Sequence, residues 1–162
     1  MPLYASSIDI ETGVMDMGNT SFTTRIVHGQ NSSLMLAERP PGYHSRPHTH
    51  DCEQLNVLHE GELHIYTEEA AYHLRAGDAL RIPPNLIHWS WNRSDAPCLL
   101  IEVHTPGIHH DPNLSEFATA LLDERDAVID AGPINKFVDF PEAELRRIES
   151  LPPSVSASGA SR

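Results

Sequence analysis

The sequence predicts one all-β domain, a sandwich or barrel with a strand count natural for a jelly roll, followed by one or two short helices. Its 162 residues are the length of a single domain, with enough material for one core. Thirteen prolines and nine glycines divide the chain into short pieces. Between residues 20 and 105 these pieces read as strands separated by turn signals, and no helical periodicity competes with them.

The predicted strands are short runs of apolar and β-branched residues, each ended by Gly, Pro, Asn or Asp. Turns are expected at 40–42, 60–61, 76–78, 83–85 and 93–95, because Gly and Asn tolerate positive φ and Pro fixes φ. Eight strands, a usual number for a jelly roll, are expected over 21–28, 33–39, 54–60, 62–67, 70–75, 78–83, 88–92 and 98–104.

The pattern changes after Pro106-Gly107. Apolar residues at helical spacing predict a helix over 114–128, and a second short helix is expected over 141–150. The resulting division is an N-terminal arm (1–20), a barrel (21–106), a C-terminal helical segment (107–151) and a disordered tail (152–162).

The composition excludes several classes of partner. A formal net charge of −12 would repel nucleic acid and anionic membranes, and no apolar run is long enough to span a bilayer. No secretory signal is visible, so a cytoplasmic location is expected. Cys52 and Cys98 lack the spacing of a zinc knuckle or redox pair and are expected to be reduced, with burial favoured over a chemical role for Cys52.

Histidine is unusually frequent: ten of the 11 lie between His44 and His110. His48 and His50 are two apart, so on a strand both point to one face and both can contact one ion. Gln54 or Glu53 offers a third donor, and His88 follows a turn that returns a strand beside the first. Three imidazoles and one oxygen suit zinc, iron, manganese, nickel or cobalt.

These residues fall into a pattern that resembles the cupin superfamily. The first cupin motif is Gly, five residues, His-x-His, three or four residues, Glu, six residues, Gly. Here it reads Gly42, five residues, His48-Thr49-His50, three residues, Gln54, six residues, Gly61. Glutamine therefore stands where the family has its glutamate ligand.

The second cupin motif is Gly, five residues, Pro-x-Gly, two residues, His, three residues, Asn. The sequence has Gly77, five residues, Pro83-Pro84-Asn85, two residues, His88, three residues, Asn92. Only the turn glycine is replaced, by an asparagine that also accepts positive φ. The resemblance covers about residues 25 to 105 and implies a metal cupin with His48, His50, Gln54 and His88 as ligands.

Gln54 is favoured over Glu53 because it has the family spacing from Gly61 and shares strand parity with the two histidines. Glu53 would then face away from the site. The choice matters for chemistry, since four neutral ligands leave the full +2 charge on the ion and make it a stronger Lewis acid.

Other side chains are candidates for catalysis or packing. His104 shares one strand face with Leu100 and Glu102, and it either enters the barrel or is exposed at the strand end. His44, four residues before His48, is a second candidate base. His64 and His73 are expected on solvated faces or as passive pocket lining, and His109 and His110 on the surface beyond the barrel. Trp89 and Trp91 are expected on the face opposite the ligands.

The His, His, Gln, His set resembles that of small cupins such as polyketide cyclases, lyases and sugar-acid isomerases. This resemblance implies a zinc-preferring enzyme, most specifically a bacterial aromatic polyketide cyclase that closes a poly-β-keto substrate by aldol attack and dehydration. His104 or His44 would remove the α-proton. A ferrous dioxygenase and a non-catalytic small-ligand-binding cupin are the alternatives, and a homodimer is expected from family analogy.

Overall fold

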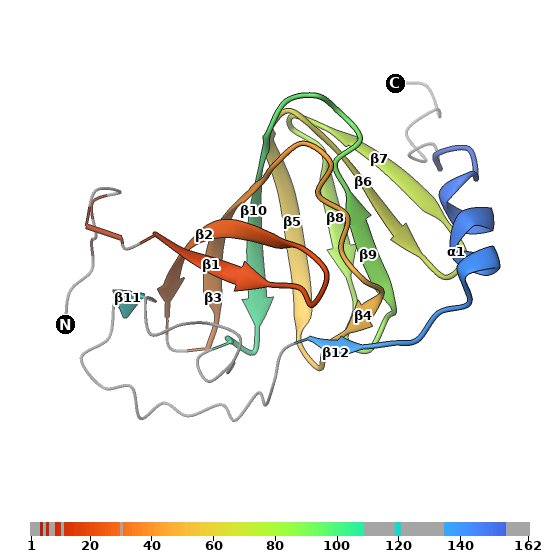
Figure 1. Cartoon of the computed structure of the whole chain (residues 1–162). Coiled ribbons are helices and arrows are strands. Elements are labelled where there is room, and N and C mark those ends of the chain that lie inside the picture. The colour runs from red at the N-terminus through yellow and green to blue at the C-terminus, as the bar shows by residue number, and fades with distance from the viewer. Residues whose placement is uncertain are drawn as a thin grey trace, which may run out of the picture.

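The computed structural model describes residues 4, 6, 9–10, 12–29, 31–108, 119–120 and 135–154. Over these residues the chain forms two facing sheets that enclose a barrel, with one short helix on the outside (Figure 1). Almost all of the strand pairs are antiparallel. The predicted all-β barrel is therefore confirmed.

The larger sheet has seven strands within the described residues, in the order β1-β2-β3-β10-β5-β8, and β11 pairs with β2 in parallel. Its members are β1 (Thr12–Asp16), β2 (Ser21–His28), β3 (Ser33–Arg39), β10 (Cys98–Thr105), β5 (Glu53–Glu60), β8 (Ala79–Ile82) and β11 (Thr119–Ala120).

The smaller sheet has five strands in the described part of the chain, in the order β12-β4-β9-β6-β7. Its members are β12 (Lys136–Phe137), β4 (His48–Thr49), β9 (His88–Trp91), β6 (Glu62–Thr67) and β7 (Ala71–Arg75).

Strand alternation decides which side chains enter the barrel. Along β10 the burial alternates strictly, and Leu100, Glu102 and His104 are the buried set. The interior holds two apolar clusters, one around Met15, Phe22 and Met35 and the other around Leu58, Leu63 and Leu100. Polar side chains lie between these clusters, and they form the candidate site described below.

The helix α1 (Glu142–Glu149) covers the outer face of the smaller sheet (Figure 1). A third apolar cluster fills this contact, with Ile148 from the helix packed against Tyr66, Ala71 and Trp89. Trp89 thus packs into a core layer on the face opposite the predicted ligands. No helix in the described ranges has the length and apolar character needed to cross a membrane.

The eight predicted strands correspond to β2, β3 and β5 to β10, with ends that differ by at most one residue. The helix expected over 141–150 is α1. The helix expected over 114–128 is not supported where the structure describes it, because Thr119–Ala120 form β11 beside β2; its other residues lie outside the described ranges. β1 lies in the segment expected to be an arm.

Candidate metal and substrate site

The sheet pairing brings the four predicted ligands together inside the barrel. His48 on β4 pairs directly with His88 on β9 across the smaller sheet, and their ring centroids are 4.3 Å apart. The His50 ring lies 4.9 Å from that of His88 and 6.2 Å from that of His48. Gln54, near the start of β5, is buried in the facing sheet.

Each of the three histidine rings is held by a backbone carbonyl at Nδ1. A carbonyl only accepts, so Nδ1 carries the hydrogen, and a neutral ring then presents the lone pair of Nε2. Burial lowers the pKa of His48 to about 4 and that of His88 well below its usual value, so both rings are neutral at pH 7. The Nδ1 partners are the carbonyls of Arg46 at 2.9 Å for His48, Cys52 at 2.8 Å for His50 and Leu86 at 3.0 Å for His88.

The Gln54 amide has a fixed orientation. Its Nε2 donates to Asn56 Oδ1 at 2.7 Å and to Glu102 Oε2 at 3.0 Å, which turns Oε1 toward His50. Oε1 lies 2.9 Å from His50 Nε2. With Nδ1 of His50 donating to a carbonyl, this contact joins two acceptors unless a proton or a metal ion lies between them.

The donor atoms are of the types that bind a divalent ion, but the imidazole rings are not close enough together to coordinate one as they stand. In the part of the chain that the structure describes, no three His, Cys, Asp or Glu side chains form a group that could hold a metal as they stand. The 2.9 Å contact between His50 and Gln54 is nevertheless close to the edge of about 3 Å between neighbouring ligands of an octahedral ion with bonds of about 2.1 Å. A metal would therefore require the imidazoles to close around it.

His104 enters the barrel and does not lie exposed at the strand end. Its position on β10 is opposite Gln54, and its ring centroid is 5.9 Å from that of His50. Burial, followed by the neighbouring His50, lowers the pKa of His104 to about 3. Its Nε2 lies 3.6 Å from Glu102 Oε2, and its Nδ1 has no hydrogen-bond partner within the described residues.

His44 is not brought to this cluster. Its ring stacks on Trp91 at 4.4 Å, and its Nε2 lies 2.7 Å from Glu149 Oε1 on α1, outside the barrel. The suggestion that His44 is the catalytic base is therefore not supported by its position.

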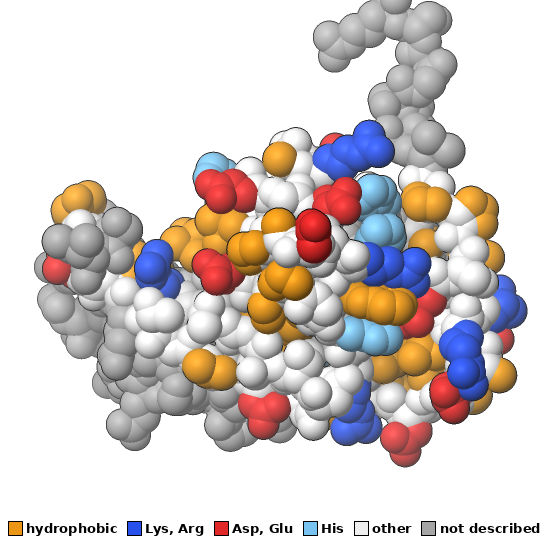
Figure 2. Space-filling model, turned by 45° about the horizontal axis from the view of Figure 1, so that its top comes forward, with side chains coloured by type: hydrophobic (Ala, Val, Ile, Leu, Met, Phe, Trp, Pro, Cys, Tyr) orange, Lys and Arg blue, Asp and Glu red, His pale blue; other side chains and the backbone are white. Residues whose placement is uncertain are grey.

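The remaining sequence expectations concern the outer surfaces. Glu53 faces outward and pairs with Arg81, which agrees with the choice of Gln54 as the inward donor. His64 and His73 stack on each other at 4.3 Å on the outer side of the smaller sheet. In Figure 2, histidine side chains on this surface lie beside basic and hydrophobic ones. His109 and His110 lie outside the described residues.

The comparison with known families agrees with the barrel and with both motifs. The model of the family described as Cupin domain matches residues 35–104, which contain His48, His50, Gln54, His88 and His104. The matched stretch, less than half of the chain, is thus similar to the cupin family, and the two sheets have the cupin fold.

Solved structures with the cupin fold are similar to this chain. KdgF from Halomonas sp. has a TM-score of 0.58 and 18% identity, covering 65% of this chain and 94% of that chain. An RmlC-like cupin from Shewanella frigidimarina has a TM-score of 0.56 and 20% identity, covering 65% of this chain and 92% of that chain. A cupin-superfamily sugar phosphate isomerase from Silicibacter pomeroyi has a TM-score of 0.56 and 19% identity, covering 63% and 74%.

Among curated proteins, the chain is similar to the HTH-type transcriptional regulator PuuR of Escherichia coli K12. The two are 29% identical over 98 residues, which are 57% of this chain and 53% of the regulator. The same regulator from Shigella flexneri matches equally. The chain thus spans about half the length of the curated relatives that it matches.

Sequence reasoning missed a buried charged pair that lines the pocket of the barrel. Arg39, at the end of β3, is 5% exposed, and its Nη2 donates to Glu102 Oε1 on the neighbouring β10. The guanidinium lies 3.6 Å above the Phe22 ring. The alternation along β3 was the available signal, because Arg39 has the same parity as the inward residues Met35 and Ala37.

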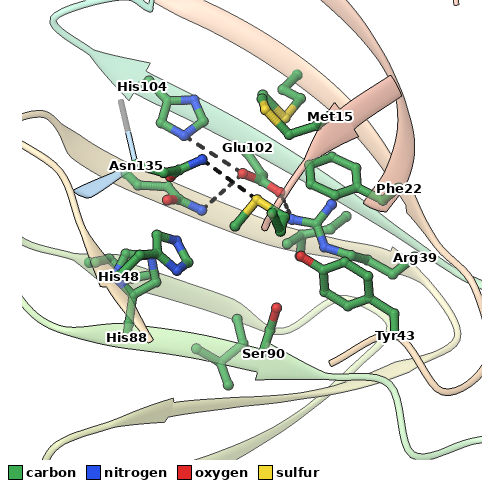
Figure 3. A pocket seen from close by; sticks show the side chains of 16 residues that line it. Met15, Phe22, Arg39, Tyr43, His48, His88, Ser90, Glu102, His104 and Asn135 are labelled. Atoms are coloured by element: carbon green, nitrogen blue, oxygen red, sulfur yellow. Dashed lines mark hydrogen bonds and ion pairs between the residues drawn. The ribbon is translucent and has the colours of Figure 1, made fainter. Parts of the chain in front are cut away.

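The pocket of the barrel lies between the two interior clusters and has both apolar and polar lining. Its space is about 460 Å³ when the solvent at its open mouth is counted. In Figure 3, His48 and His88 lie on one side, Arg39 and Tyr43 on the other, and Glu102 between them. Its lining is completed by Met15, Met17, Phe22, Met35, Gln54, Ile65, Ile82, Ser90, Leu100, His104 and Asn135.

Proposed function

We propose that this cupin barrel binds one divalent metal ion through His48, His50, Gln54 and His88 and performs non-oxidative carbonyl chemistry on a small molecule. The observation that supports this most directly is the anchoring of all three imidazoles at Nδ1 by backbone carbonyls. Metal-binding histidines usually donate their other ring N–H in this way. Zinc is the preferred ion, and Fe, Mn, Ni or Co also suit the donors.

The ligand set determines the kind of chemistry. Four neutral donors would leave the ion its full +2 charge, and when bound it would supply Lewis acidity to a substrate carbonyl oxygen. Gln54 is held in place by Asn56 and Glu102, so its carbonyl oxygen is available without further ordering.

His104 is the proposed proton acceptor. Its ring is neutral at pH 7, and Nδ1 has no partner among the described residues. Nδ1 would take a proton from the carbon next to the substrate carbonyl. Glu102, whose Oε2 is 3.6 Å from Nε2, would stabilise the positive ring that results.

In its most specific form, the proposed reaction is aldol cyclisation and dehydration of a poly-β-keto substrate. Methionine and phenylalanine side chains line the pocket together with polar groups. In the proposed reaction the substrate chain would fold with its carbonyl groups toward the histidines, which would bring the reacting carbons together.

Metal analysis of the purified protein tests the first part of the proposal. We expect about one metal per chain, and a loss of affinity of at least about tenfold in His48→Ala and His88→Ala. His44→Ala is the matched control, because His44 lies outside the barrel, and it should keep its metal. Retention of metal by His48→Ala, or an equal loss in His44→Ala, would overturn the assignment.

Oxygen uptake separates the proposed chemistry from that of a ferrous dioxygenase. The protein is incubated with a poly-β-keto substrate, a flavonol or a β-diketone in an oxygen electrode, and products are followed by mass spectrometry. Loss of water from the poly-β-keto compound without oxygen consumption supports the cyclase. Iron content together with oxygen consumption would replace it by the dioxygenase.

A second candidate function is non-catalytic binding of a small ligand. The similarity to a transcriptional regulator over 98 residues favours this alternative. His88→Ala distinguishes the two functions: a binding protein would keep its ligand affinity and biological activity after metal loss, whereas the proposed enzyme would lose turnover.

A further inference from the structure

Arg39 has more hydrogen-bonding capacity than the protein uses. Its Nη2 donates to Glu102, but Nε and Nη1 are buried and have no hydrogen-bond partner within the described residues. A buried donor without a partner destabilises the folded protein, and more so on a charged group than on a neutral one. A guanidinium whose only task was to neutralise Glu102 would not need to lie at the pocket wall with these donors unused.

The position of Arg39 gives these donors a use. The residue lines the pocket on the side opposite His48 and His88 (Figure 3). Its Cζ atom lies 3.6 Å from the centroid of the Phe22 ring and 5.0 Å from that of the Tyr43 ring. A guanidinium packed in this way keeps a fixed position, and a carboxylate accepts strong, charge-assisted hydrogen bonds from its N–H groups.

The charge of the pocket would depend on the metal. Arg39 and Glu102 cancel each other. A divalent ion on neutral ligands would bring the pocket to a net positive charge, which a ligand carboxylate would reduce. Glu102 opposes the anion, so its removal should strengthen binding.

We propose that the pocket takes a small apolar molecule with a carboxylate, and that Arg39 donates from Nη1 to this carboxylate while the rest of the ligand reaches toward the histidines. This inference rests on the proposed function because it names the substrate class of the same pocket. Carboxylate binding can nevertheless be measured on metal-free protein, apart from metal binding and turnover.

The probes are about twenty monocarboxylates of four to ten carbons, each paired with its primary amide, which has the same shape and no charge. Binding to metal-free protein is measured by ligand-observed NMR and calorimetry. We expect several acids to bind at least about tenfold more tightly than their amides, as a charge-assisted hydrogen bond to a buried guanidinium requires. Equal binding of acids and amides, or no binding of any acid, overturns the proposal.

Substituting only one partner of the Arg39–Glu102 pair leaves a buried charge unpaired, which alone can unfold the protein, so the folding of every variant is checked by circular dichroism. The test variant is therefore Arg39→Met/Glu102→Gln, which removes both charges and should abolish the preference for acids. Glu102→Gln alone keeps Arg39 and should tighten acid binding severalfold. Opposite effects of these two variants are expected only if Arg39 contacts the ligand; equal weakening in both overturns the proposal.

Two controls complete the experiment. Arg25→Met makes the same substitution on the exposed face of the adjacent β2 and should leave acid binding unchanged. Metal content is measured on every variant: retained acid preference with no metal affinity would refute the proposed metal site alone, and metal binding without acid preference would refute only the role of Arg39.

Discussion

The Oε1 atom of Gln54 lies 2.9 Å from Nε2 of His50, while the other end of the same amide donates to Glu102 at 3.0 Å. Gln54 therefore links the histidine cluster to the buried Arg39–Glu102 pair. A glutamate in its place, as in the usual cupin motif, would set two carboxylates about 3 Å apart, where both cannot ionise without a large cost.

Gln54→Glu should accordingly lower the thermal stability of the metal-free protein at pH 7, by at least about 3 °C. Added zinc or manganese should restore the melting temperature, because the ion neutralises the pair and gains a charged ligand. Differential scanning calorimetry with chelator and with metal measures both effects. An unchanged melting temperature without metal would contradict the arrangement, and Glu53→Gln on the outward face is the control.

The sequence was sufficient to predict the strands and the inward donors because both follow from local alternation. β10 is continuous from Cys98 to Thr105, so the parity that links His104 to Leu100 holds along its whole length. β5 is equally regular, which is why Gln54 and not Glu53 faces the barrel interior.

Strand alternation predicted the wrong side of the sheet for His44, because the strand is interrupted between His44 and His48. His44 and His48 are an even number of residues apart, but His44 lies in an isolated bridge to Trp91, and the strand β4 begins only at His48. The two rings therefore take opposite sides of the sheet. The pairing of Arg39 with Glu102 depends on β3 lying beside β10, and residues 63 positions apart carry no local signal of such a contact.

Gly61, the last glycine of the first motif, tests whether motif spacing reflects packing. Its φ is +79°, and an added Cβ would lie 2.8 Å from Cys98 Cβ and 3.1 Å from the Cys98 Cα. Gly42 has a similar φ of +74° with nothing within 4 Å of the added atom. Gly42→Ala should therefore lower the free energy of unfolding only by the cost of the left-handed conformation, about 1 to 2 kcal/mol.

Gly61→Ala should lower the free energy of unfolding by about 1 to 3 kcal/mol more than Gly42→Ala does, because overpacking adds to the backbone strain. Urea unfolding of the two variants measures the difference. Equal stabilities would show that the turn after β5 can move away from Cys98 without loss.

Glu149 attaches α1 to the barrel. Its Oε1 accepts from Trp89 Nε1 at 2.9 Å and lies 2.7 Å from His44 Nε2, and its backbone carbonyl accepts from Arg93 Nη2. Glu149→Ala leaves the buried indole N–H without an acceptor, which should lower the free energy of unfolding by about 1 to 3 kcal/mol.

Tryptophan emission should shift to longer wavelength as the helix loosens in Glu149→Ala, while metal content stays unchanged. Glu144→Ala removes an exposed carboxylate from the same helix and should change neither signal. A native emission spectrum in Glu149→Ala would contradict the attachment.

The free energy of unfolding should depend on pH through His64. Burial, followed by the neighbouring His73 and Arg93, lowers the pKa of His64 from 6.5 to about 4. Between these two values the unfolded chain binds the proton and the folded protein does not, so acidification favours unfolding. The contribution of His64 is present above pH 6.5 and is lost as the pH falls toward 4.

His64→Gln should therefore flatten the fall in unfolding free energy between pH 6.5 and 4, relative to the parent protein at each pH. Urea titrations at half-unit intervals measure the slope, and NMR of the ring protons reports the pKa of His64 directly. His59, exposed at 57% near the end of β5, is the matched control for the same substitution. A ring that titrates near 6.5, or an equal flattening in His59→Gln, would contradict the burial of His64 as the cause.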